Sequence, residues 1–359
     1  MKTTMRRLFL IPGLFAIAIT ACSQKKTEEP EVAQTSGDLA VLEWAGYDAA
    51  DFWTDFKDKY PDARVSFEIG SSDADVYGKM KAGTKADVFH SYTGWLQFYV
   101  DEGLVEEIDV SKLQNWSKVP ESFRAIGRIN GKQYFLPWDW GFTSILYRTD
   151  KVKDTIDSWA ALLDPKYKGH ISTWDDGPGM VTVSSYIHQY DETAITAEQL
   201  AAIKAEWIKQ RELNLFYWAG EPELIDSMAN GDVWVAYGWQ GTYATLLGKG
   251  IPVAYADPKE GRNSWVGVYG IRKGTRNKDL ALRFLDEKLA NATANNVVTQ
   301  FYYGVANDEV MKGISDPTLK QAFSVDDPTV LQRTNFTPNL TAQQRDDWTA
   351  MWTEVKAAP

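Results

Sequence analysis

The stretch that decides the fold is GKQYFLPWDWGFTSILY, residues 131–147. A turn at its start leads into a run made mostly of apolar and aromatic residues, which predicts a strand. Patterns typical of strands and helices lie on both sides of this run. We therefore expect the strand to cross between two halves of the molecule.

The sequence before this strand alternates between strand and helix patterns. Leu39–Trp44 is a short apolar run, and Ala63–Ile69 alternates as a second strand would. Between them, Ala49–Tyr60 has apolar residues at helical spacing. The pattern continues with a helix at Asp75–Ala82, a strand at Ala86–His90 and a helix at Trp95–Glu102. This alternation predicts an α/β fold with a largely parallel sheet.

The same alternation returns after the central strand. Thr196 precedes a long amphipathic helix that ends at Arg211, and it is a suitable N-cap residue. The other expected elements are strands at Ile171–Thr173, Val233–Tyr237 and Ile251–Ala256 and a helix at Leu280–Ala290. We expect Val266–Ile271 to run back from the second half to the first.

The N-terminus has the three parts of a secretory signal. Three basic residues precede an apolar stretch over residues 8–19, and the small-residue run ITAC ends at Cys22. A cysteine directly after the cleavage site is the lipid acceptor of a bacterial lipoprotein. We expect residues 1–21 to be a signal peptide, Cys22 to be lipidated, and the polar residues 22–38 to be a flexible tether.

Two other interpretations of the N-terminus stay open. The segment is an ordinary signal peptide if Cys22 is incidental. A membrane-spanning helix is disfavoured, because the apolar run is shorter than the roughly 20 residues that a bilayer requires. The lipoprotein interpretation places the mature protein in the periplasm or cell envelope, anchored to a membrane by lipid.

Composition limits the partners of this chain. With 38 basic and 49 acidic residues its net charge is −11, which disfavours binding to nucleic acid or anionic lipid. The single cysteine, once lipidated, leaves none for an internal disulfide. A length of 359 residues fits two domains of about 150 residues each. We expect a monomer.

Aromatic residues are abundant: 15 Trp, 17 Tyr and 15 Phe. Core packing explains most of them, but several tryptophans lie beside Gly, Asp or Ser in contexts typical of loops. These are Trp44, Trp95, Trp138, Trp140, Trp174, Trp239 and Trp265. Aromatic residues in loops often contact ligands.

Motifs for catalysis and cofactor binding are missing from the sequence. It contains no G-x-S-x-G, no H-E-x-x-H, no P-loop and no dinucleotide fingerprint, and its three histidines are scattered. Asp175-Asp176 is a carboxylate pair that suits a helix N-cap better than a glycosidase. Tyr302-Tyr303 suits core packing better than ferric iron. We expect no enzymatic activity, no cofactor and no metal.

Several motifs together resemble the extracellular solute-binding proteins of ABC importers, and within them the spermidine/putrescine-binding proteins. The resemblance covers about residues 39–356. The segments that carry it are Trp44-Ala45-Gly46-Tyr47, Ser91-Tyr92-Thr93, Pro137-Trp138-Asp139-Trp140-Gly141, Trp159 to Gly169, Asp175-Asp176, Trp239-Gln240, Trp265, and Tyr303 with Asn307.

The resemblance implies a two-lobed periplasmic-binding-protein-like fold of type II, in which crossover strands form a hinge. Lobe 1 is expected at 39–143 and 267–311, and lobe 2 at 144–266 and 312–359. A small amine would bind between them and be delivered to an ABC permease. The residues implied for binding are Trp44, Tyr47, Tyr92, Trp138, Asp139, Asp176, Trp239, Trp265 and Tyr303.

Two positions depart from the polyamine-binding pattern. Gly179 stands where that family has a glutamate, and Gly267 stands where it has an aspartate. The loss of two carboxylates disfavours a multivalent cation, whereas aromatic walls suit a single cation through cation–π attraction. Asp139 and Asp176 are left to supply negative charge. The alternative for Asp139 is a solvated loop acid, and the alternative for Asp176 is a helix cap.

The ligand and the role therefore stay open at this point. A polyamine, another cationic amine, and a quaternary or betaine-like zwitterion are all compatible with aromatic walls. A protein of this build also serves as a sensor that presents its ligand to a membrane receptor. A secreted hydrolase is the third class, for which no convincing catalytic set is present.

Overall fold

The computed structural model describes residues 35–327, 329–338 and 340–358, without the side chains of Leu331 and Gln332. The predicted signal peptide, the predicted lipidation site Cys22 and nearly all of the predicted tether lie outside the described residues. The described residues form one compact unit. In the described part of the chain, no helix has the length and apolar character needed to cross a bilayer.

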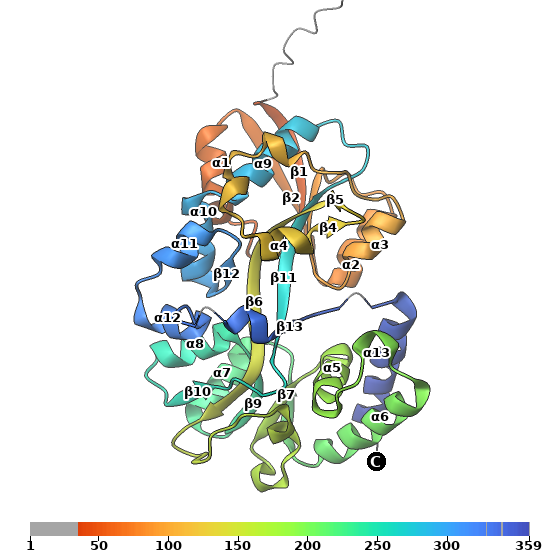
Figure 1. The fold of residues 1–359 in the computed structure, drawn as a ribbon, viewed down its shortest axis with the longest axis vertical. Coiled ribbons are helices and arrows are strands. Elements are labelled where there is room, and N and C mark those ends of the chain that lie inside the picture. The colour runs from red at the N-terminus through yellow and green to blue at the C-terminus, as the bar shows by residue number, and fades with distance from the viewer. Residues whose placement is uncertain (1–34, 328, 339, 359) are drawn as a thin grey trace, which may run out of the picture. The chain divides into compact units, whose positions relative to one another are not determined.

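Most described strands belong to one mixed sheet whose main path runs β2-β1-β3-β11-β6-β9-β7-β8, and β10 and β12 pair with β6 while β13 pairs with β11 (Figure 1). The strands are β1 (Gly37–Trp44), β2 (Ala63–Gly70), β3 (Val88–Tyr92), β4 (Arg128–Ile129), β5 (Lys132–Gln133), β6 (Phe135–Arg148), β7 (Ile171–Trp174), β8 (Asn214–Trp218), β9 (Val235–Trp239), β10 (Val253–Tyr255), β11 (Arg262–Ile271), β12 (Gly304–Val305) and β13 (Thr334–Phe336). The short strands β4 and β5 form a separate hairpin.

Helices pack on this sheet and on one another. They are α1 (Thr54–Lys59), α2 (Asp73–Lys81), α3 (Leu96–Asp101), α4 (Glu121–Ile126), α5 (Gly177–His188), α6 (Ala197–Arg211), α7 (Glu221–Asn230), α8 (Gln240–Gly248), α9 (Lys278–Lys288), α10 (Asn291–Asn296), α11 (Asp308–Gly313), α12 (Pro317–Phe323) and α13 (Ala342–Ala357). The C-terminal helix α13 packs on α5 and α6, and α12 packs on α8.

The strand predicted to cross between two halves is β6. All 14 of its residues are buried. Its first part, which includes Phe135 and Phe142, packs in one hydrophobic core, and its last part, which includes Ile145 and Tyr147, packs in another. We call these the first and the second core. The antiparallel strand β11 runs beside β6 and returns to the first core, as predicted (Figure 1).

Each core has a parallel set of strands. In the first core β1 pairs in parallel with β2 and β3, and in the second core β7 pairs in parallel with β8 and β9. Every strand predicted above is present, with ends shifted by a few residues. The α6 prediction is also confirmed, because Thr196 and Gln199 form a reciprocal capping box.

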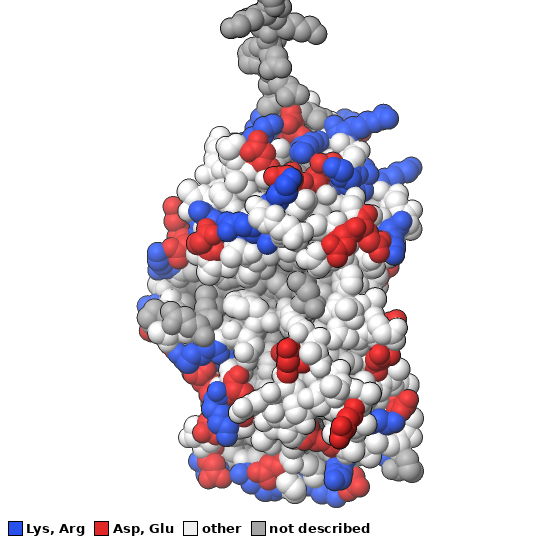
Figure 2. All heavy atoms as spheres, turned by 45° about the vertical axis from the view of Figure 1, so that its right-hand side comes forward, with Lys and Arg blue, Asp and Glu red and all other residues white. Residues whose placement is uncertain are grey.

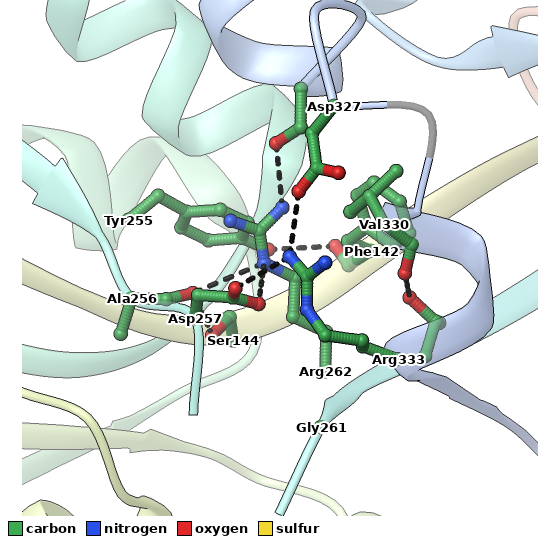
Figure 3. Close-up of polar contacts among 12 residues, drawn as sticks. Phe142, Ser144, Tyr255, Ala256, Asp257, Gly261, Arg262, Asp327, Val330 and Arg333 are labelled. Atoms are coloured by element: carbon green, nitrogen blue, oxygen red, sulfur yellow. Dashed lines mark hydrogen bonds and ion pairs between the residues drawn. The ribbon is translucent and has the colours of Figure 1, made fainter. Parts of the chain in front are cut away.

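The C-terminal segment returns to the crossing strands through an arginine-rich contact (Figure 3). Arg333 donates from Nη2 to Asp257 and Asp327, at 2.7 Å in each case. Arg262, which begins β11, lies over the Tyr255 ring at 5.2 Å from its centroid and donates from Nε to the carbonyl of Ala256. These contacts hold the segment before β13 against β10 and β11.

The lobe boundaries were predicted at 143/144, 266/267 and 311/312. The last of them falls in a segment that packs against both cores. Ile314, Leu319 and Phe323 belong to the first core, and the intervening Ala322 belongs to the second. The lobe boundaries stay a prediction. Three tryptophans given loop contexts above lie inside strands instead. Trp138 and Trp140 are buried in β6 and Trp265 lies within β11, so that part of the sequence interpretation is wrong.

Candidate functional site

Five parallel strands end in an aromatic residue. They are β1 at Trp44, β3 at Tyr92, β7 at Trp174, β8 at Trp218 and β9 at Trp239. In open α/β sheets, ligands bind in the crevice beyond the carboxyl ends of the strands. The sequence therefore puts large π surfaces where such a fold binds its ligand.

The aromatic rings at the first core form a continuous chain of edge-to-face contacts. Trp44 contacts Tyr92 at 5.2 Å between ring centroids, Tyr92 contacts Trp265 at 5.2 Å, and Trp265 contacts Tyr303 at 4.8 Å. All four side chains are partly exposed, unlike most aromatic residues of the core. Four of the predicted binding residues are thus brought together.

A second aromatic group lies at the second core. The ring of Trp239 contacts Trp174 and Trp218, at 5.4 Å in each case and near a right angle. Trp218 is fully buried, whereas Trp174 and Trp239 are partly exposed. Trp218 therefore supports the two outer rings from beneath.

Strand β6 separates the two aromatic groups. Trp265 on β11 pairs with Gly141, and Trp239 on β9 pairs with Thr143. Residues 141 and 143 of a strand point to the same face, and directly paired residues share that face. The two predicted tryptophans therefore flank the crossing strand on one face, and Gly141 leaves space for the Trp265 ring, which lies 2.6 Å from where its Cβ would be.

Tyr47 and Asp139 lie beneath the first aromatic group. The Tyr47 hydroxyl donates to Oδ2 of Asp139 at 2.6 Å, and both side chains are buried. Asp139 is 0% exposed on β6, so the solvated-loop alternative for this acid is wrong. Its other oxygen, Oδ1, lies 3.6 Å from Nε2 of His90. In this geometry Asp139 holds the Tyr47 ring in position.

A buried charge network extends from this pair. His90 Nδ1 lies 2.6 Å from Oε1 of Glu43, and the Tyr269 hydroxyl donates to the other Glu43 oxygen. The ammonium group of Lys288 lies 3.7 Å from Glu43 and 4.1 Å from the centroid of the Trp138 ring. Two acids and two bases therefore neutralise one another under the aromatic rings.

The network shifts the pKa values of its members. Burial alone would lower the pKa of His90, but the carboxylates of Glu43 and Asp139 raise it to about 9. Burial lowers the pKa of Lys288 to about 8, against the opposing effect of Glu43 and Asp139. The nitrogens of His90 and Lys288 thus lie against the carboxylates of Glu43 and Asp139.

Gly267 has no side chain because the network occupies that space. A Cβ at residue 267 would lie 1.9 Å from Oδ1 of Asp139 and 2.7 Å from Nε2 of His90. An aspartate there, as in the polyamine-binding pattern, does not fit beside Asp139. Asp139 therefore occupies the space that a side chain at residue 267 would need.

Asp176 lies at the second core and caps α5. Its Oδ2 accepts from the backbone N–H of Gly179 at 2.6 Å, as the capping alternative predicts. The side chain is still partly exposed, and burial raises its pKa to about 6. Asp73 on α2 is similar in exposure and has a pKa raised by burial to about 6.

The sequence interpretation missed an arginine that faces both of these acids. The charge of Arg345 on α13 lowers the pKa of Asp73 and of Asp176, partly opposing burial. Its guanidinium donates to the carbonyl of Gly94 at 2.7 Å and lies 4.3 Å from the centroid of the Trp95 ring. Nothing in the local pattern around residue 345 indicates this role.

The other predicted residue, Trp138, lies in the first core rather than at a surface. Its ring is 1% exposed, and its Nε1 donates to the carbonyl of Lys288 at 2.9 Å. Glu43, His90 and Lys288 were also missed, although a glutamate inside the apolar run before Trp44 is a usable signal.

Figure 2 shows that charged side chains gather toward the two ends of the face drawn, with an almost uncharged band between them.

The sequence matches the family described as bacterial extracellular solute-binding protein over residues 51–322. The chain belongs to this family. The putrescine-binding periplasmic protein PotF of Escherichia coli K12 is 26% identical over 369 residues, with 97% of each chain covered. That relative is named as a periplasmic protein that binds putrescine.

Solved structures show the same fold. A putative spermidine/putrescine ABC transporter protein from Listeria monocytogenes matches with a TM-score of 0.77 at 22% identity, covering 90% of this chain and 100% of the other. The substrate-binding protein PotD of Streptococcus pneumoniae strain Canada MDR_19A matches with a TM-score of 0.75 at 20% identity, covering 90% and 99%. The predicted type II periplasmic-binding-protein-like fold is confirmed.

Gly267→Ala is expected to destabilise the protein by about 1–3 kcal/mol, because the new methyl group overlaps Asp139 and His90. Chemical denaturation of the purified protein measures the change. The matched control is Gly78→Ala on α2, where nothing lies within 4 Å of the added Cβ. We expect this control to be neutral or stabilising by up to about 1 kcal/mol. Equal stability of the Gly267→Ala variant and the parent would contradict the steric account.

The stability that His90 contributes should depend on pH. Its folded pKa of about 9 exceeds the unfolded value of about 6.5, so the folded state binds the proton more tightly. The contribution is complete below pH 6.5 and is lost as pH rises through 9, with an upper limit of roughly 3 kcal/mol.

The measurement compares the free energy of unfolding of the parent and His90→Asn across this pH range. The difference between the two proteins should shrink from pH 6.5 to pH 9. Lys288 and the acids with raised pKa values remain in both proteins, so their titration cancels to first order. A difference that is constant with pH would show that His90 is not charged in the folded protein.

Proposed function

We propose that this chain is the lipid-anchored binding component of an ABC importer, and that it captures a small cationic amine between its aromatic rings. The observation that carries the proposal is the pair of partly exposed aromatic groups on either side of β6, represented by Trp239 and Trp265. A cation over an aromatic face gains up to about 2 kcal/mol when desolvated.

The names of two relatives support the choice of ligand. PotF and the spermidine/putrescine-binding periplasmic protein of Escherichia coli K12, which is 25% identical over 320 residues, are both named for amines. Trp44, Tyr92 and Trp239 lie at the ends of parallel strands, where open α/β sheets bind ligands. Trp44, Tyr47, Tyr92, Asp176 and Tyr303 complete the proposed binding set.

We infer that the two cores belong to two lobes that meet where β6 and β11 cross, near residues 143–144 and 266–267. A ligand that contacts both aromatic groups only when the lobes approach shifts the population toward that closed state. The closed form then docks on a membrane permease. Lipid on Cys22 keeps the protein at the membrane and raises its effective concentration near that permease.

A thermal-shift screen with putrescine, spermidine, choline and glycine betaine tests the proposal. A ligand at about 100 times its Kd stabilises the folded protein by about 2.7 kcal/mol. We expect an amine to do this, and we expect Trp239→Ala and Trp265→Ala each to weaken its binding by about tenfold or more, since each removes one π surface.

The matched control is Trp234→Ala. Trp234 precedes the opposite end of β9, and its ring stacks on His170 at 3.6 Å between centroids. This variant should bind the amine as the parent does. If both Trp239→Ala and Trp265→Ala also bind as the parent does, the aromatic site is refuted.

A further inference from the structure

The carboxylates around the aromatic groups differ in whether a positively charged side chain of the protein lies near them. Asp139 is fully buried and lies beside His90. Burial raises the pKa of Asp73 and of Asp176, and the charge of Arg345 opposes this effect in both. These acids have their charge opposed by the protein itself.

Glu221 is the exception. It is the first residue of α7, it is partly exposed, and its Oε2 accepts from the Thr242 hydroxyl at 2.6 Å. Among the residues that the structure describes, no Lys, Arg or His nitrogen forms an ion pair with its carboxylate. Burial raises its pKa, and only hydrogen bonds from Thr242 oppose that effect. A half-buried carboxylate of this kind gains from an incoming cation.

The position of Glu221 connects it to the proposed binding set. Burial raises the pKa of the Tyr303 phenol, and the charge of Glu221 raises it further. The Tyr303 ring contacts Trp265. The carboxylate of Asp139 raises the pKa of Tyr303 as well. Glu221 therefore lies on the second-core side of a ring that belongs to the first aromatic group.

A second acceptor lies close to this carboxylate. A Cβ at Gly241 on α8 would lie 3.3 Å from Oε2 of Glu221 and 3.4 Å from the carbonyl oxygen of Phe301. Because residue 241 has no side chain, two oxygen acceptors lie near the same point. They are Oε2 of Glu221 on α7 and the carbonyl oxygen of Phe301. A cation with N–H donors can bond to such oxygens, whereas a trimethylammonium group cannot.

We propose that Glu221 receives the cationic group of the ligand, and that this group is a primary ammonium rather than a quaternary one. This inference rests on the proposed function, because it names the anion and the ligand class of that same site. It assigns to α7 a charge that the polyamine-binding pattern places at residues 179 and 267.

Isothermal titration with putrescine, n-butylamine and the N-permethylated form of each tests the inference. The paired compounds differ only in methylation at nitrogen, so they separate N–H donation from charge. We expect the parent to bind at least one primary amine and to prefer it at least tenfold over its methylated partner. Glu221→Gln should weaken binding of that amine at least tenfold and should reduce the preference.

Glu223→Gln is the matched control, because Glu223 lies exposed on the same helix. It should leave both the affinity and the preference unchanged. Glu221→Asp retains the charge on a shorter side chain and should bind with intermediate affinity. The melting temperature of each unliganded variant establishes that it is folded.

The outcomes separate this inference from the proposed function. If an amine binds the parent and Trp239→Ala weakens it, but Glu221→Gln and Glu221→Asp do not, the role of Glu221 is wrong and the amine site stands. A parent that prefers the methylated compounds also overturns the inference. If no amine binds the parent at all, the proposed function itself fails.

Discussion

The structure depends on one strand that is shared by two hydrophobic cores. Every residue of β6 is buried, and its two ends pack in different cores. It pairs with β11 on the way back and with β9 beside it. Because β6 runs through both cores, it sets the register of the strands that carry Trp265 and Trp239, and thereby places the two aromatic groups on one face.

The same strand also carries the acid that organises the floor of the site. Asp139 accepts from Tyr47 and faces His90, and this costs less than an isolated buried carboxylate because Glu43 and Lys288 complete a neutral set. The absence of a side chain at Gly267 is the steric consequence. We infer that this network holds the aromatic wall rigid, so that binding energy is not spent on ordering it.

Apolar periodicity was sufficient to predict an α/β fold, because it is a local property, whereas the type II fold was implied by the family resemblance. The strand over residues 131–147, the return strand and the Thr196 cap were all predicted from such patterns. Trp44 was predicted at the end of a strand, whereas Trp138 and Trp140 were given loop contexts. Their neighbours Pro137, Asp139 and Gly141 resemble loop residues, yet all lie inside a buried strand.

Long-range pairing of charges was beyond the sequence. His90 and Glu43 are 47 residues apart, and Arg345 reaches Gly94 over 251 residues. No local pattern links such positions, and a single sequence gives no covariation between them. Glu221 was overlooked for the same reason, since only the folded chain places it near Tyr303.

The most direct test of the central claim is a crystal structure grown with the amine that stabilises the protein most. The account predicts electron density for that amine between the rings of Trp239 and Trp265, with the segments before and after residue 143 packed in separate lobes. Density for the amine away from both rings, or a single undivided core, would contradict it.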